Sequence, residues 1–168
     1  MKHIARNAPR FASRGGGVPA RPPLDAEGLE RFVEAQAPVY DAVCRELGAG
    51  RKTSHWMWFV FPQLRVLGRS ATARFFGLAD LAEARAYAAH PVLGPRLVEC
   101  SARVLALPGR SAHQIFGTPD DLKLRSCMTL FELAAAAPAP VFARVLERLY
   151  GGERDPLTLA ALGGRDPP

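Results

Sequence analysis

The sequence predicts an all-α protein, an irregular and compact bundle of about seven to nine short helices with no β-sheet. Three observations lead to this prediction. From residue 29 onward, apolar side chains recur at intervals of three and four residues, as on one face of an amphipathic helix. Polar capping residues or prolines precede several of these segments and glycines follow them. The one dense apolar run, residues 55–61, has no second run to pair with as a strand.

Proline and glycine interrupt the helical pattern at short intervals, which keeps the expected helices short. From the N-terminus onward these helices span 29–47 (two helices, or one kinked at Pro38), 55–61, 70–76, 80–89, 92–107, 111–116, 118–137, 140–149 and 155–162. The residues expected to begin or cap helices, by accepting hydrogen bonds from the first turn, are Thr53 or Ser54, Asp80 with Glu83, Ser111 with Gln114, Thr118, and Asp155.

Charge is distributed unevenly along the chain. The formal net charge is +6, of which +5 lies in residues 1–23, a stretch without any acidic residue. We predict a disordered basic tail over residues 1–24, a single helical domain over 25–163 and a flexible C-terminus over 164–168. The tail either has no partner or contacts nucleic acid through its arginines. The domain itself is nearly neutral.

Composition argues against several classes of protein. No apolar run approaches the roughly 18–20 residues that span a bilayer, and the N-terminus lacks the apolar core of a secretory signal. We therefore expect a cytoplasmic protein with no membrane contact. The three cysteines are expected to be buried thiols, because they are far apart and lie in apolar helical patterns: Cys44, Cys100 and Cys127. The four histidines lack ligand spacing, so neither a metal nor a cofactor is predicted.

Residues 50–63, GRKTSHWMWFVFPQ, gather basic, hydroxyl and imidazole groups before a predicted helix start. Backbone N–H groups and the helix dipole favour an anion at such a place. The segment is not a P-loop, because that motif requires glycine where this chain has Glu46 and Arg51. The alternative interpretation is structural, with the tryptophans as core anchors and the cations solvated. The candidate ligand-binding residues here are Lys52, Ser54, Trp56 and Gln63, and His55 is the candidate catalytic residue.

Residues 116–126, FGTPDDLKLRS, form the second candidate segment. Asp120 and Asp121 suit the positive end of a helix dipole. Asp121 and Arg125 are also spaced for a surface ion pair, which contributes only about 0.3–0.5 kcal/mol. Lys123 lies between two leucines and is expected to project into a groove. All four are candidate ligand-binding residues.

The chain has 19 arginines but only three lysines. Two of these lysines, Lys52 and Lys123, lie in the two candidate segments, and the third is in the tail. An ammonium group approaches a phosphate as a compact point charge, which a guanidinium does not. This distribution gives weak additional support to a function for both segments.

Three motifs in this order and spacing, GRKTSHWMWFVFPQL, AEARAYAAHPVLGPRLVEC and IFGTPDDLKLRSCMTLFE, resemble the family called domain of unknown function 1810. The resemblance covers roughly residues 29–162. It implies a compact all-α fold, as in the uncharacterised bacterial proteins of that family, but no established activity. Some relatives are labelled calpastatin, and we reject this label because calpastatins are disordered. The family's polar positions correspond to Arg51, Lys52, Ser54, His55, Gln63, Asp120, Asp121, Lys123 and Arg125.

The leading functional hypothesis is a site that binds or processes an anionic, nucleotide-like small molecule. It predicts that both segments face one concave site, with their charged ends within about 10–12 Å. One alternative is a protein-interaction module without catalysis, which would expose the aromatic side chains of residues 56–61. The other alternative is nucleic-acid binding through the basic tail.

Overall fold

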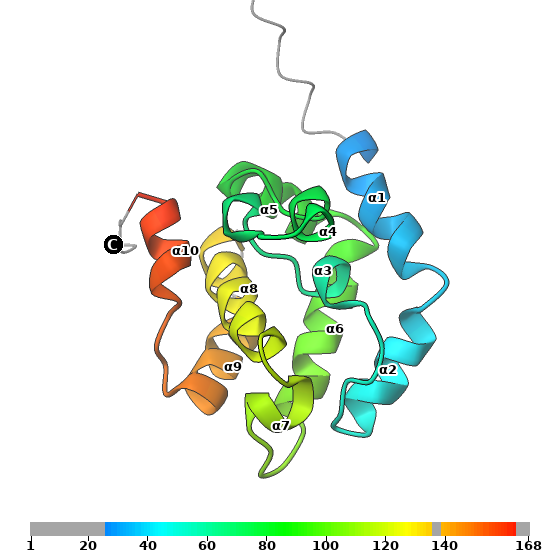
Figure 1. Ribbon diagram of the computed structural model, residues 1–168, viewed down its shortest axis with the longest axis vertical. Coiled ribbons are helices and arrows are strands. Elements are labelled where there is room, and N and C mark those ends of the chain that lie inside the picture. The colour runs from blue at the N-terminus through cyan, green and yellow to red at the C-terminus, as the bar shows by residue number, and fades with distance from the viewer. Residues whose placement is uncertain (1–25, 136–138, 164–168) are drawn as a thin grey trace, which may run out of the picture.

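The computed structural model describes residues 26–135 and 139–163 (Figure 1). The predicted tail, 1–24, and the predicted flexible C-terminus, 164–168, lie outside the described residues. The helices are α1 (Ala26–Gln36), α2 (Tyr40–Gly48), α3 (Met57–Val60), α4 (Ala71–Phe75), α5 (Leu81–Ala89), α6 (Leu93–Leu105), α7 (Ala112–Phe116), α8 (Asp120–Ala134), α9 (Pro140–Tyr150) and α10 (Pro156–Ala161), with a 3-10 turn, η1, at Arg65–Leu67.

The all-α prediction is confirmed. Over the described residues there are ten α-helices and no sheet. Leu64 and Leu78 form an isolated parallel β-bridge. The count exceeds seven to nine because the pattern over 29–47 forms two separate helices, α1 and α2. A turn over residues 37–39 separates α1 from α2, so Pro38 precedes the second helix.

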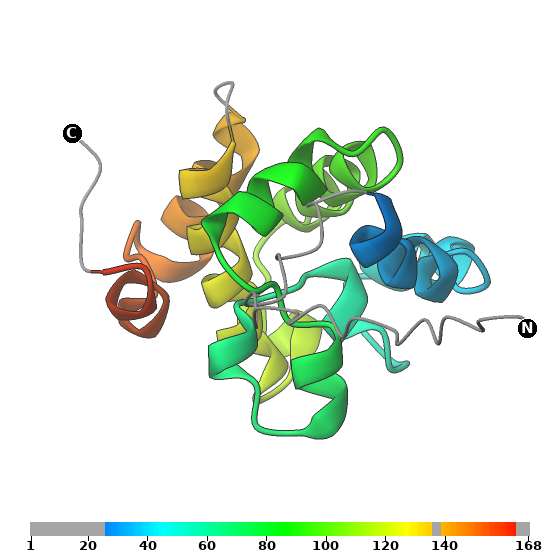
Figure 2. The same cartoon turned by 90° about the horizontal axis from the view of Figure 1, so that it is seen from above.

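Helix α8 forms the centre of the core. It packs against α5, α7, α9 and α10. Its side chains are buried on nearly all faces, since Leu124, Cys127, Met128, Leu130 and Phe131 are fully shielded from solvent. Both views place α10 at one edge of the molecule and α1 with α2 at the opposite edge (Figures 1 and 2). The helix that carries the second candidate segment is therefore held rigidly at the middle of the fold.

Local capping rules explain several helix starts. Asp80 accepts the N–H of Glu83, and Asp155 accepts that of Thr158. Ser111 and Gln114 form the reciprocal capping box predicted for α7. Each side chain satisfies backbone N–H groups that a first helical turn leaves free. Such starts are set by residues within one turn of the helix, which is why the sequence indicates them.

Two predicted caps are wrong. Neither Thr53 nor Ser54 caps α3, because Trp56 occupies the cap position and Glu46 on α2 accepts both backbone N–H groups and the Ser54 hydroxyl. Thr118 does not cap α8, because Pro119 occupies the cap position and the Thr118 hydroxyl donates to Asp121. In both cases the hydroxyl group that was expected to cap the helix donates to a carboxylate instead.

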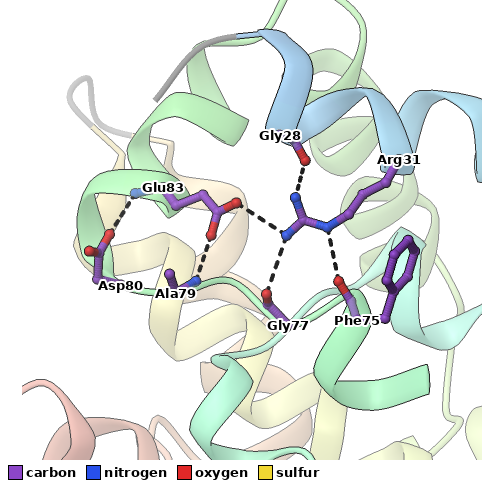
Figure 3. A network of polar contacts seen from close by, with 7 residues as sticks. All are labelled: Gly28, Arg31, Phe75, Gly77, Ala79, Asp80 and Glu83. Carbon is purple, nitrogen blue, oxygen red and sulfur yellow. Dashed lines mark hydrogen bonds and ion pairs between the residues drawn. The ribbon is translucent and has the colours of Figure 1, made fainter. Parts of the chain in front are cut away.

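One guanidinium fastens α1 to the α4–α5 connection (Figure 3). The Arg31 side chain donates to the carbonyls of Gly28, Phe75 and Gly77 and pairs with Glu83 at 3.1 Å. The other carboxylate oxygen of Glu83 accepts the N–H of Ala79 at 2.6 Å. Segments about fifty residues apart are thus joined by one charge pair that is largely shielded from solvent.

Candidate functional site

The loop between α2 and α3 is shaped by a single carboxylate. Glu46, on α2, accepts the N–H groups of Thr53 and Ser54 at 2.8 and 3.1 Å, and it also accepts the Ser54 hydroxyl. The indole N–H of Trp56 donates to the same carboxylate at 2.8 Å. These four donors fix the loop that carries Lys52.

The donors also change the ionisation of Glu46. Partial burial acts to raise its pKa, but the hydrogen bonds from Ser54, Thr53 and Trp56 outweigh that effect. The pKa of Glu46 is lowered from 4.5 to about 2. The carboxylate is therefore charged at neutral pH, and it serves the loop rather than a ligand.

The second candidate segment follows α7 directly. Gly117 has a φ of +68°, a left-handed conformation that favours glycine, and it turns the chain from α7 into the start of α8. The N–H of Lys52 donates to the carbonyl of Ile115 at 2.7 Å, which ties the first loop to α7. Two segments separated by about seventy residues therefore lie side by side.

The two domain lysines meet at one acid. Lys52 Nζ lies 2.9 Å from Asp120 Oδ2, and Lys123 Nζ lies 3.3 Å from Asp120 Oδ1. All three side chains are largely shielded, with exposed fractions of 9% for Lys52, 18% for Asp120 and 24% for Lys123. Each ammonium also lies over an indole ring, Lys52 over Trp56 at 5.4 Å and Lys123 over Trp58 at 5.6 Å. The cluster carries a formal charge of +1.

Lys52 also lines a wide basic cleft of about 630 Å³ between the α2–α3 loop and α7. Arg110 crosses to the loop and donates to the Gly50 carbonyl at 3.2 Å. The polar lining consists of Arg51, Lys52, Arg110, His113 and Gln114, over a floor that includes buried Phe116. Three basic side chains line this cleft, and no acidic side chain is among the described residues that line it.

Gln63 and Lys123 line a different hollow, beside Trp58 and Phe76. Its volume of about 10 Å³ holds about one water molecule. The two segments therefore do not line one shared cavity. Lys52 lines the basic cleft, Lys123 lines the small hollow, and Asp120 forms an ion pair with each lysine.

Arg125 lies apart from this cluster. Its guanidinium pairs with Glu153 at 3.1 Å and donates to the carbonyls of Glu153 and Arg154. The expected ion pair between Asp121 and Arg125 is therefore wrong, because Arg125 pairs with Glu153 in the loop between α9 and α10. Asp121 instead contacts Thr118 and His113.

The aromatic residues of the first segment are mostly inaccessible. Trp56 is 1% exposed, so its ring cannot stack on a ligand as the sequence suggested. Met57, Phe59 and Phe61 are buried as well, which leaves Trp58 as the half-buried ring of this run. His55 is exposed and stacks on Trp58 with ring centroids 6.5 Å apart. The interaction-module alternative required these side chains to be exposed, and all of them except Trp58 are buried.

Sequence reasoning missed three residues of this region, namely Glu46, Arg110 and His113. The signal for His113 was present, because the Ser111–Gln114 capping box predicted a helix that ends at Gly117, next to the second candidate segment. Glu46 and Arg110 carry no local signal. Their roles depend on contacts with residues 53–56 and with Gly50, and the sequence pattern does not show which helix lies beside that loop.

No helix of the described residues is both long and apolar enough to cross a membrane. In the same part of the chain, no three His, Cys, Asp or Glu side chains are grouped so that they could hold a metal ion. Cys100 and Cys127 are buried and Cys44 is half-buried, and all three are free thiols. Burial raises the pKa of the Cys100 thiol to about 12, which disfavours the reactive thiolate.

The fold and the lysine cluster define a class of irregular, all-helical proteins with a basic cleft. The chain belongs to the DUF1810 family, described as a protein of unknown function, whose model matches residues 26–162. It is similar to the crystal structure of the conserved hypothetical protein Rv1873 from Mycobacterium tuberculosis, with 55% sequence identity and a TM-score of 0.80. That match covers 82% of this chain and 98% of the other. No curated protein matches the chain.

Proposed function

We propose that the chain binds a small anionic ligand, one that carries a phosphate group as nucleotides do, in the basic cleft. The observation that carries this proposal is the set of cations around the cleft. Arg51, Lys52 and Arg110 line it, and Asp120, which pairs with Lys52, is shared with Lys123. Among the described residues, neither Arg51 nor Arg110 has a carboxylate partner.

An anion would relieve this excess of positive charge. Guanidinium groups bind phosphate oxygens through paired hydrogen bonds, and a lysine adds a compact charge. The cleft is also large enough, since small-molecule sites commonly occupy roughly 300–1,000 Å³. Lys123 supports the site indirectly, because it shares Asp120 and so leaves Lys52 only partly neutralised.

Calorimetry and thermal unfolding test the proposal with inorganic phosphate, pyrophosphate, sugar phosphates and nucleoside mono-, di- and triphosphates. A ligand at about 100 times its Kd stabilises a protein by about 2.7 kcal/mol, which raises Tm by several degrees for a chain of this length. We expect at least one member of the panel to do so, with affinity that falls as salt is added.

Variants locate the binding. Arg110→Gln and Lys52→Met should each weaken binding of that ligand by about tenfold or more, equivalent to about 1.4 kcal/mol. Arg103→Gln is the matched control, because this arginine pairs with Glu99 on the exposed face of α6. No Tm shift with any member at millimolar concentration would refute the proposal. Equal losses in Arg103→Gln and Arg110→Gln would do so as well.

A further inference from the structure

The imidazole of His113 lines the basic cleft and is held by the start of α8. His113 Nδ1 lies 3.1 Å from the Thr118 hydroxyl and 3.4 Å from Asp121 Oδ2. Thr118 in turn donates to the same Asp121 oxygen at 3.2 Å. The other carboxylate oxygen of Asp121 accepts the N–H of Leu122 at 2.9 Å, which fixes the orientation of the acid. The His113 side chain is 68% exposed and therefore reachable by a ligand.

These contacts favour one of the two tautomers of the neutral His113 ring. A carboxylate only accepts hydrogen bonds, so Nδ1 facing Asp121 has to be a donor. The Thr118 hydroxyl gives its single hydrogen to Asp121, and towards His113 it therefore presents a lone pair. An Nδ1–H satisfies both neighbours, and in that tautomer Nε2 of the neutral ring is the unprotonated, basic nitrogen. A second group that orients an imidazole in this way is a recurring feature of acid–base sites.

His55 lacks this arrangement. Among the residues that the structure describes, it has a ring neighbour, Trp58, but no hydrogen-bond partner. Its tautomer is therefore not fixed, and it does not line the cleft that holds Arg51, Lys52 and Arg110. Proton transfer was assigned to His55 from the sequence, and the geometry favours His113 for that role.

We infer that the cleft hydrolyses phosphate monoesters, with His113 as the proton-transfer group and Asp121 as a positioning residue. The inference rests on the proposed binding function, because the phosphate must first be held by Arg51, Lys52 and Arg110. Nε2 of His113 takes a proton from water as the water oxygen forms a bond to phosphorus. The P–O bond to the alcohol breaks on the opposite side of phosphorus, the leaving oxygen takes a proton from solvent, and the imidazolium then releases its proton to solvent. The products are the free alcohol and inorganic phosphate.

The chemistry is tested by phosphate release from p-nitrophenyl phosphate and from nucleoside monophosphates, with the full chain. His113→Asn keeps a donor near the position of Nδ1 and lacks Nε2, so it should lower kcat by about 10²–10⁴-fold. His90→Asn is the control, since His90 only accepts the N–H groups of Val92 and Leu93, a role that asparagine also performs. Asp121→Asn should lower kcat with KM nearly unchanged.

Nitrogen-15 NMR of the imidazole rings provides a readout that needs no substrate. Wild-type His113 should show the Nδ1–H tautomer, and Asp121→Asn should shift it towards Nε2–H, the form that free imidazole rings prefer. A wild-type ring in the Nε2–H form would overturn the inference. So would phosphate binding in the cleft with no turnover of any ester, or with equal turnover in His113→Asn. Failure of phosphate to bind at all would instead refute the proposed function.

Discussion

Replacing Glu46 by Gln tests the idea that this carboxylate holds the α2–α3 loop. Its pKa falls from 4.5 to about 2 because the hydrogen bonds from Ser54, Thr53 and Trp56 outweigh the opposing effect of burial. A pKa difference of this size corresponds to about 3 kcal/mol of stability, at about 1.4 kcal/mol for each unit. The carboxylate is partly exposed, so solvent screening reduces the expected contribution to about 1–2 kcal/mol.

The sign of the pH dependence follows from the direction of the shift. A carboxyl whose pKa is lowered by folding stabilises the folded state above its unfolded pKa, and the contribution is lost as pH falls through the folded pKa. The free energy of unfolding of the wild type should therefore exceed that of Glu46→Gln by the full amount above about pH 5. This difference should vanish towards about pH 2. Urea unfolding of both proteins at several pH values measures this difference. The contributions of the other acidic residues are the same in both proteins and therefore cancel when the two free energies are subtracted.

Glu147→Gln is the matched control, because this acid is exposed on α9 and its replacement should change the free energy of unfolding little at neutral pH. A difference between wild type and Glu46→Gln that stays constant from pH 6 to pH 3 would refute the reasoning. It would show that the four donors do not act on an ionised carboxylate.

Three further substitutions have defined outcomes. Lys123→Met should raise the Kd of the phosphate ligand more than tenfold in calorimetry and change stability by less than about 1 kcal/mol, and unchanged affinity would contradict its role. Gly94→Ala places a Cβ 2.2 Å from the Ala88 carbonyl oxygen, so it should cost at least about 1–3 kcal/mol in urea unfolding, whereas Gly48→Ala, with open space around it, should not. Tyr87→Phe removes the hydroxyl that contacts the Phe59 carbonyl and Gln36, so it should lower the free energy of unfolding by about 1–2 kcal/mol. A change well outside this range would contradict the hydrogen-bond network.

The helical architecture could be predicted because its signals are local. Asp80 and Ser111 cap helices within one turn of themselves, and apolar spacing marks the face that each helix buries. The capping predictions failed where a carboxylate accepts a hydrogen bond from the hydroxyl that was expected to cap the helix. The Ser54 hydroxyl donates to Glu46 and the Thr118 hydroxyl donates to Asp121, while Trp56 and Pro119 occupy the cap positions of α3 and α8. Capping rules contain no information about such competitors.

The candidate site was predicted only in part. The scarcity of lysine marked Lys52 and Lys123, and the structure brings both to Asp120. The partner of Arg125 was predicted wrongly. Asp121, four residues before it, was expected to pair with it, whereas Glu153 does so in the folded chain. Aromatic content likewise does not tell a buried ring from an exposed one, and Trp56 is part of the core.

The Arg31 contacts have a consequence for local opening of the fold. The guanidinium holds the carbonyls of Phe75 and Gly77 together with Glu83, and the neighbouring Phe32 ring is fully buried. Helix α1 cannot separate from the body without releasing all of these groups at once. Amide hydrogens of α1 and of residues 75–83 should therefore exchange with solvent in one cooperative event, at a common free energy, rather than by independent fraying from the helix end.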